Sequence, residues 1–314
     1  MTYTPTAIDL SRVGVPPVIE VLDYEVMLSA AIDRFMVDYE AARVRDPSLP
    51  AYTVEMLQTD AVVVELRTWS NLRLYDRQRV NDAIDGLLAV RAKGGNLDTI
   101  VAGRNVERMT ISPADGDTAA VMEGDAALLR RYLLSFDAPA SGSAGRYLFD
   151  AWSAWPQSAD KTLGLWDARV NGRAVHGRRG DTDVVVIGPA GRLPTDLELS
   201  TVRAAVTDPN RAPEAVAISV MAATRSEYEV RLRIRLATGG AIAEIIRQEV
   251  IRRVTDAATA RVLIGGEIPE GLLRGAAYGD GVIGVVDLDP VVIAANPYKV
   301  PVMTAIDVSI EVSP

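Results

Sequence analysis

The segment Thr53–Arg108 constrains the fold most, because it is the longest periodic stretch in the chain. Its apolar residues recur at steps that fit one side of a helix with 3.6 residues per turn. They are Leu57, Ala61, Val64, Leu72 and Tyr75. The pattern predicts a long amphipathic helix that stops at Gly94-Gly95, where glycine readily adopts the positive φ that ends helices. Unbroken, it would span about 60 Å. Asn96 can then cap a short second helix.

A further amphipathic pattern precedes this segment. Asp23 is a candidate N-cap, and Asp46-Pro47 ends the predicted helix. Its apolar stripe consists of Leu28, Ile32, Phe35 and Tyr39. Residues 1–22 contain three prolines and isolated apolar residues, which is typical of an extended arm. Each predicted helix can bury its stripe against its neighbour or against a second copy of the chain, and the sequence leaves both open.

The middle of the chain mixes connections and helices. Residues 110–124 are rich in Ser, Pro, Asp and Gly, and Asp115-Gly116-Asp117 is better read as a turn than as a calcium loop. Helical spacing then returns at Asp125–Phe136 and at Gly145–Trp155. The second of these carries aromatic residues that we expect to anchor a core or an interface. These are Tyr147, Trp152 and Trp155.

Residues 167–181 form the most basic local stretch. Its cationic residues lie among Gly and Asn, and Asn171-Gly172 is a signal for a two-residue hairpin turn. They are Arg169, Arg173, His176, Arg178 and Arg179. The segment is predicted to be an exposed hairpin or loop, which is either solvated or in contact with an acidic partner or an anion.

The C-terminal half alternates predicted strands and helices. Thr195–Val206 is a predicted helix, and 228–236 is the clearest strand, because apolar residues alternate with Glu229, Arg231, Arg233 and Arg235. One of its faces is therefore apolar and the other charged. A helix with apolar positions from Ile242 to Val254 follows Gly239-Gly240. Further strands are predicted near 261–264, 282–287, 291–293 and 302–312, and others at 184–187 and 216–221.

These elements predict an α+β fold, with a helical N-terminal domain, a middle mixed segment and two small sandwich-like α+β units with mostly antiparallel sheets. The predicted divisions are an arm at 1–22, a helical domain at 23–109, a connecting domain with an inserted basic loop at 110–182, and α+β domains at 183–238 and 239–314.

Composition narrows the chemistry. A formal net charge of −9 disfavours general binding to nucleic-acid phosphates, and the absence of cysteine removes thiolate catalysis and cysteine zinc sites. His176 is the single histidine, and no Gly-x-Ser-x-Gly motif presents a nucleophile. We expect no signal peptide, no membrane span, and no catalytic, cofactor-binding or metal-binding residues.

Two alternatives to a purely structural role remain at this point. Gly279–Gly284 fits the dinucleotide-binding pattern, and Asp287 with Asp289 could bind a cation, so a nucleotide- or metal-dependent enzyme is one alternative. However, Val285 onward reads as a strand where a dinucleotide site needs a helix. The second alternative is a nucleic-acid-binding module that uses residues 167–181.

Several segments together resemble the baseplate J-like proteins, which are wedge components of contractile phage tails and related injection particles. The most specific is Asp76-Arg77-Gln78-Arg79-Val80-Asn81-Asp82-Ala83, followed by Leu88-Ala89, Gly94-Gly95-Asn96-Leu97-Asp98, Val106 and Arg108. Similar blocks occur at Ile8–Ser11 with Asp23–Glu25, at Ser143–Phe149 and at Val184–Leu236. The chain departs from the family at Ile100-Val101, and residues 156–182 and 266–281 look like insertions.

The resemblance implies a structural protein that, with a second copy of itself and smaller wedge proteins, builds a ring around the tail hub and changes arrangement on contraction. It implies contacts with the hub and with sheath-adjacent proteins, assembly in the bacterial host cytoplasm, no catalytic residues, no nucleic-acid partner and no membrane insertion. The candidate partner-contact residues come from the segment that begins around Asp76, which we call the signature segment, and from the charged face of the strand at 228–236. They are Tyr75, Arg77, Arg79, Leu97, Arg231, Arg233 and Arg235.

Overall fold

The computed structural model describes residues 14–52, 59–237 and 239–312. The chain divides into two compact units, Asp9–Ile100 and Val101–Pro314, which are described separately below. The block Ile8–Ser11 and the predicted beginning of the long helix at residues 53–58 lie outside the described residues. The predicted α+β class is confirmed, because a helical N-terminal region precedes the larger sheets.

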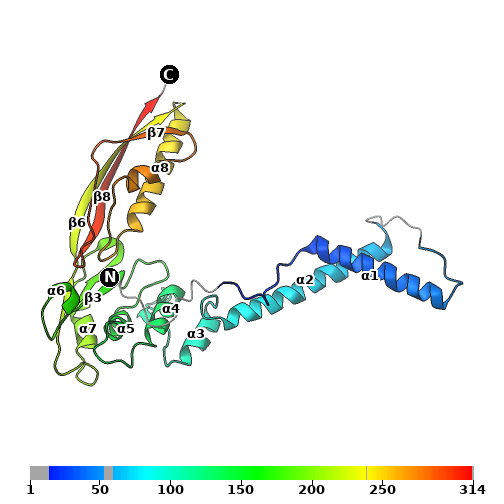
Figure 1. Ribbon diagram of the computed structural model, residues 1–314, viewed down its shortest axis with the longest axis horizontal. Helices are drawn as coiled ribbons and strands as arrows, with labels where there is room; N and C mark the ends of the chain where they lie inside the picture. The colour runs from blue at the N-terminus through cyan, green and yellow to red at the C-terminus, as the bar shows by residue number, and fades with distance from the viewer. Residues whose placement is uncertain (1–13, 53–58, 238, 313–314) are drawn as a thin grey trace. The chain divides into compact units, whose positions relative to one another are not determined.

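The first unit contains a helical hairpin of α1 (Tyr24–Arg45) and α2 (Ala61–Leu87), drawn in blue and cyan in Figure 1. Asp23 caps α1 as predicted, since its carboxylate accepts hydrogen bonds from the backbone N–H groups of Glu25 and Val26. Asp60 caps α2, where its carboxylate accepts a hydrogen bond from the Val62 N–H. At the connection between the helices, three aromatic rings pack within 5.2 to 5.7 Å of one another, and these belong to Phe35, Tyr39 and Tyr52.

The helix α2 is shorter than the sequence predicted. It ends at Leu87, seven residues before Gly94, so its 27 residues span about 40 Å. Leu88 has an extended backbone, and Arg91 turns back to form an ion pair with Asp85. Gly94 has a φ of +51° in the turn that precedes α3 (Gly95–Ala102). The predicted short helix is therefore present, but a turn separates it from α2.

The predicted apolar stripe of α2 is exposed, and a different face of the helix packs inside the protein. Val64, Leu72 and Tyr75 are 48%, 60% and 69% exposed, whereas the buried residues of α2 are Val63, Ser70 and Asn81. Two of the three buried residues are polar, so hydrophobic periodicity could not identify this face. The stripe of α1 meets the prediction better, because Leu28, Ile32, Phe35 and Tyr39 are all partly buried.

The second unit begins with a small hairpin and a mixed α/β region. The elements in chain order are β1 (Thr110–Ser112), β2 (Val121–Met122), α4 (Asp125–Leu134), α5 (Ala144–Ala154), β3 (Asp167–Asn171), α6 (Arg173–His176), β4 (Asp181–Ile187), η2 (Pro189–Gly191), α7 (Asp196–Val206) and β5 (Ala217–Ala222). The order β3-β4-β5 combines an antiparallel with a parallel pair. Tyr147, Trp152 and Trp155 are 1%, 3% and 8% exposed, so these aromatics are core residues.

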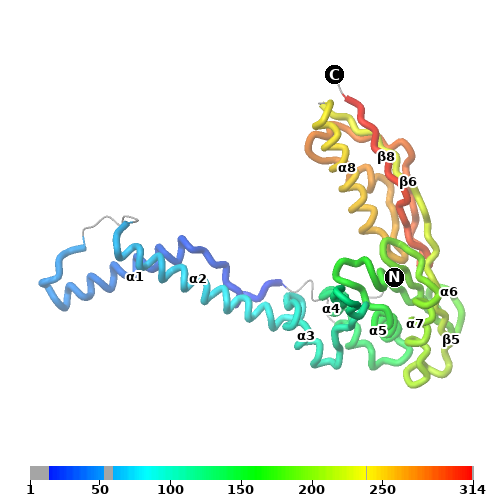
Figure 2. Tube along the Cα trace, turned by 180° about the vertical axis from the view of Figure 1, so that it is seen from behind, coloured from blue at the N-terminus to red at the C-terminus, as the bar shows by residue number. Residues whose placement is uncertain are grey.

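The C-terminal part of this unit is a sheet covered by one long helix. Its elements are β6 (Thr224–Leu236), α8 (Ala241–Thr259), α9 (Leu272–Ala276), β7 (Val282–Asp287) and β8 (Lys299–Val312). β6 is central, antiparallel to β7 and parallel to β8. Figures 1 and 2 show α8 along one face of this sheet, where the apolar residues of β6 meet Val250 and Val254.

The pairing of β6 groups residues 224–236 with the chain after residue 239. β6 thus pairs with two strands that lie beyond the predicted boundary at residue 238. A shared apolar cluster joins the two sheets, and it contains Val185, Ile187, Ala223, Val262, Ile264, Val300 and Val302.

Three local predictions are wrong, and one is the strand near 291–293, where Ile293 forms only an isolated bridge with Ile268. Asn171-Gly172 does not form a two-residue turn, because the short helix α6 stands between β3 and β4, although these strands do pair as a hairpin. Residues 261–264 form no strand. Turn hydrogen bonds and side chains satisfy their backbone instead: Val262 N–H donates to Thr259 O, Trp166 Nε1 donates to Val262 O, and Asp167 accepts from the Ile264 N–H.

Candidate interaction surfaces

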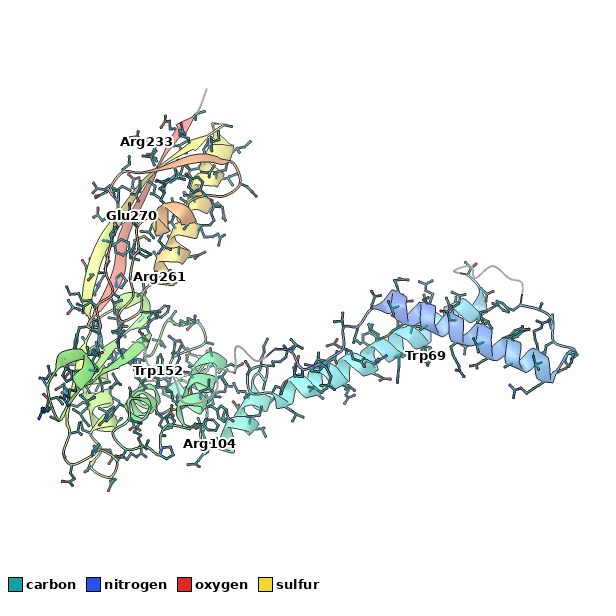
Figure 3. All side chains as sticks on the ribbon, viewed as in Figure 1. Trp69, Arg104, Trp152, Arg233, Arg261 and Glu270 are labelled. Atoms are coloured by element: carbon teal, nitrogen blue, oxygen red, sulfur yellow. The ribbon has the colours of Figure 1, made fainter. Side chains whose placement is uncertain are left out.

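An open, mostly apolar groove with a volume of about 600 Å³ lies between α1 and α2. We call it the helix groove. Its apolar lining is Met27, Ala30, Ala31, Phe35, Val62, Leu66 and Trp69, and its charged lining is Arg34, Asp38, Glu65, Arg73 and Arg77. Trp69, labelled in Figure 3, is 51% exposed. The predicted apolar stripe of α2 does not include this face, although Val62, Leu66 and Trp69 recur at the helical steps of four and three.

The helical hairpin buries very little apolar surface of its own. Of the 22 residues of α1 only Ala31 is buried, and of the 27 residues of α2 only Val63 is a buried hydrophobic residue. Helices in water owe most of their stability to the packing of an amphipathic face. The exposed side chains on both helices therefore suit burial against another protein.

The signature segment of α2 holds the N-terminal arm. The side-chain amide of Asn81 donates to the Glu20 carbonyl at 2.9 Å and accepts from the Glu20 N–H at 3.1 Å. Arg77 Nε lies 2.6 Å from the Glu20 carboxylate, and this hydrogen bond lowers the pKa of Glu20 below its ordinary value. We call these three residues the arm clamp. Nothing in the sequence pattern revealed it, because Glu20 and Asn81 are 61 positions apart.

The candidate contact residues of the signature segment are in different environments. Tyr75 and Arg79 are exposed on α2, and Arg77 is occupied by Glu20 of the same chain. Leu97 in α3 is 1% exposed. Because its side chain is packed inside the chain, Leu97 offers no surface to a partner and does not belong in the candidate set.

The outer face of the C-terminal sheet has the charged residues that the sequence predicted. Tyr228, Val230, Leu232, Ile234 and Leu236 are buried, and the intervening residues from Glu229 to Arg235 are exposed. Arg231 forms an ion pair with Glu229 at 2.9 Å. Arg235 lies across Gly284 of β7, where a Cβ atom would come within 3.0 Å of the guanidinium. Figure 3 labels Arg233 on β6. The three arginines thus share one face.

Arg178 of the basic loop between β3 and β4 is neutralised by carboxylates of the same chain. Arg178 donates to Asp181 at 2.8 Å and to both carboxylate oxygens of Asp183 at 2.6 and 2.7 Å. The hydroxyl of Tyr298 donates to Asp183 at 2.7 Å. Burial by itself would raise the pKa of Asp183, but the hydrogen bonds from Tyr298 and Arg178 outweigh it, and the pKa is lowered. The loop is therefore tied to the start of β8.

A buried ion pair stabilises the region just after the signature segment. Arg131 Nη1 donates to Glu123 at 2.6 Å, and the two side chains are 6% and 0% exposed. Burial raises the pKa of Glu123, and the charge of Arg131 offsets only part of that effect. Arg131 also donates to Ser153 Oγ and to the Glu107 carbonyl. The pair connects the β1–β2 region with α4 and α5.

The segments considered for enzyme chemistry do not assemble a site. Gly279–Gly281 forms a turn that leads into β7, so no helix N-terminus follows to bind a phosphate. Asp289 lies beyond β7 and its N–H donates to Asp287, so the two carboxylates do not alternate along a strand as expected. In the described ranges, no three His, Cys, Asp or Glu side chains gather in a way that could hold a metal ion. None of the described helices is both long and apolar enough to cross a bilayer.

Comparison with known proteins matches both the signature segment and most of the chain. Residues 58–115 match the baseplate J-like N-terminal domain. Over 296 residues the chain is 28% identical to baseplate protein J of Escherichia phage P2, covering 88% of each chain. The first match contains the signature residues of α2, and the second extends over both units. Together they confirm the resemblance to the baseplate J-like proteins that was found in the sequence.

Proposed function

We propose that this chain is a structural wedge protein of the baseplate of a contractile phage tail or a related contractile injection particle. In this role it assembles with a second copy of itself and with smaller wedge proteins into a ring around the tail hub. The ring connects the hub to sheath-adjacent proteins and repacks its interfaces on contraction. The protein is assembled in the bacterial host cytoplasm and acts at the tail baseplate, without catalysing a reaction.

The main support for the proposal is that the helical hairpin of α1 and α2 has almost no hydrophobic core. Two long helices bury one hydrophobic side chain each, and an apolar groove lies open between them. Surfaces of this kind on a soluble protein are typical of assembly contacts. The groove suits one more amphipathic helix, because helices in such grooves present residues at steps of three and four. A helix from a second copy is the occupant we propose.

The remaining candidate contacts fit the same role. Tyr75 and Arg79 are exposed on a face of α2 that α1 does not cover, together with Leu72. Arg231, Arg233 and Arg235 lie on the outer sheet face of the second unit. Because the two surfaces belong to different units, each chain can contact two neighbours, and such alternation of contacts closes rings.

Sedimentation equilibrium of the full chain, alone and co-expressed with a small wedge protein from the same particle, tests the proposal. We expect a concentration-dependent dimer and a larger complex that contains both proteins. A chain that remains monomeric at high concentration and does not associate with the wedge protein would contradict the proposed function.

A further inference from the structure

The strand β6 has a free edge over its first half. The Leu288 N–H donates to the Arg231 carbonyl, and β7 pairs with β6 only beyond that point. Backbone groups of alternate residues point to the same side of a strand, so those of Arg225, Glu227 and Glu229 point to the edge that β7 occupies further along. In the described part of the chain, no strand or loop backbone pairs with them there. Their N–H and C=O groups are therefore open to a further strand.

Pro290 explains why β7 does not continue along this edge. In the antiparallel register, residue 290 would stand opposite Glu229, where its N–H would extend the ladder. Proline has no N–H and is not found in the middle of a sheet. The segment 290–296 leaves the ladder, and within it Ile293 forms an isolated bridge with Ile268. The chain itself thus leaves this part of β6 without a neighbour on the β7 side.

A depression of about 620 Å³, which we call the edge slot, lies at this part of β6. It is lined by residues 226–228 of β6, by residues 290–296 and by Lys299. Tyr228 is 8% exposed, and its hydroxyl is buried without a hydrogen-bond partner among the described residues. Burial raises the pKa of the Tyr228 phenol to about 12, so at neutral pH it has a proton to donate. A buried hydroxyl without a partner is unfavourable, so an occupant that supplies an acceptor is stabilised.

Residues 6–12, which precede the described part of the chain, have a sequence that suits this edge. They belong to the segment that the sequence predicts to be an extended arm, and they are about as long as the free part of β6. In an extended segment Thr6, Ile8 and Leu10 share one face. The two apolar residues suit the apolar side chains of the slot, and the hydroxyl of Thr6 can accept a hydrogen bond from Tyr228.

We propose that residues 6–12 of a second copy bind in the edge slot as an additional strand of the C-terminal sheet. In this mode of recognition, main-chain hydrogen bonds give affinity and alternate side chains give specificity. The inference rests on the proposed function, since it names a second contact between copies of the chain. The edge slot belongs to the second unit and the helix groove to the first, so each contact can be tested without the other.

Cysteine cross-linking of the full chain tests the proposal, because the sequence has no cysteine. One chain has Ala7→Cys, Asp9→Cys or Ser11→Cys, on the arm face that would lie beside Glu227, and a second, size-tagged chain has Glu227→Cys. A disulfide needs Cα atoms within about 7 Å, so at least one of these pairs is expected to form mixed covalent dimers on mild oxidation. The matched control is Glu311→Cys, which is exposed on the same sheet face but on β8, and it is expected to give at least about fivefold less mixed dimer.

A synthetic peptide of residues 1–13 provides a second measurement. In excess it is expected to abolish the cross-linking, whereas a peptide of the same composition in scrambled order leaves it unchanged. Circular dichroism melting checks that the cysteine variants are folded. Equal yields from Glu227→Cys and Glu311→Cys would overturn the proposal. Disulfides that form only when both cysteines are in one chain would do so too, because the arm would then bind its own edge.

Sedimentation equilibrium separates this inference from the proposed function. If no mixed cross-link forms while the wild-type chain still dimerises, the inference fails and the proposed function stands. If cross-linking, dimerisation and association with the small wedge protein are all missing, both proposals fail.

Discussion

Replacing Trp69 with alanine is expected to weaken self-association of the full chain by roughly sixtyfold. Trp69 lines the helix groove and is 51% exposed in the isolated chain. Since a buried aromatic side chain covers about 150–250 Å², roughly 100 Å² of this residue is left for a partner to cover. At about 25 cal/mol per Å², its burial contributes about 2.5 kcal/mol to association. Each 1.4 kcal/mol corresponds to about a tenfold change in Kd, which gives the predicted factor.

Sedimentation equilibrium over a wide concentration range measures the effect, and circular dichroism checks helicity. Leu87→Ala is the matched control, because Leu87 is 78% exposed on the same helix but does not line the groove. It is expected to change Kd by less than about threefold. The reasoning is refuted if Trp69→Ala dimerises as tightly as the wild-type chain, or if the Leu87 variant loses the same affinity.

Three further predictions concern the arm clamp, the buried ion pair of Arg131 with Glu123, and the hydrogen bond from Tyr298 to Asp183. Asn81→Ala removes both hydrogen bonds to Glu20 and is expected to increase proteolysis of the arm before α1, with a loss of about 1–2 kcal/mol in stability; unchanged proteolysis would argue against the clamp. Glu123→Gln leaves the buried charge of Arg131 uncompensated and is expected to cost about 3–5 kcal/mol in chemical denaturation; a loss below about 1 kcal/mol would contradict this. Burial and the Asp183 carboxylate raise the pKa of the Tyr298 phenol to about 12. The hydrogen bond from Tyr298 to Asp183 therefore stabilises the fold fully below the unfolded phenol pKa of about 10. This stabilisation is lost as the pH rises through about 12. An absorbance titration of the Tyr298→Phe variant is expected to show one fewer phenol that ionises at high pH than the wild-type chain shows. If the number of such phenols is unchanged, the raised pKa does not belong to Tyr298.

Patterns that depend on neighbouring residues were predicted well from the sequence. The cap at Asp23 needs only a local polar side chain, and the alternation along β6 needs only a sheet with one buried face. Trp152 and Trp155 were expected to anchor a core or an interface, and the structure places them in a core. In these cases the local preference and the tertiary environment agree, so the pattern and the structure coincide.

The features that the sequence did not predict depend on contacts between residues that are far apart in the chain. The packing face of α2 contains Ser70 and Asn81, and Asn81 is buried because it bonds the backbone of Glu20, which periodicity cannot show. Residues 261–264 look like a strand because Val262 and Ile264 alternate, yet turn hydrogen bonds and side chains from 166 to 169 satisfy their backbone groups. Of the candidate contact residues, Leu97 was misplaced because an apolar residue in a short helix fits a core and an interface equally well.

Electron microscopy of particles from host cells whose copy of this chain has been deleted tests the structural role most directly. Our account predicts tubes or tails without complete baseplates, restored by the wild-type chain and poorly restored by the Trp69→Ala chain. Deleted particles that retain complete baseplates and still deliver their contents would contradict it.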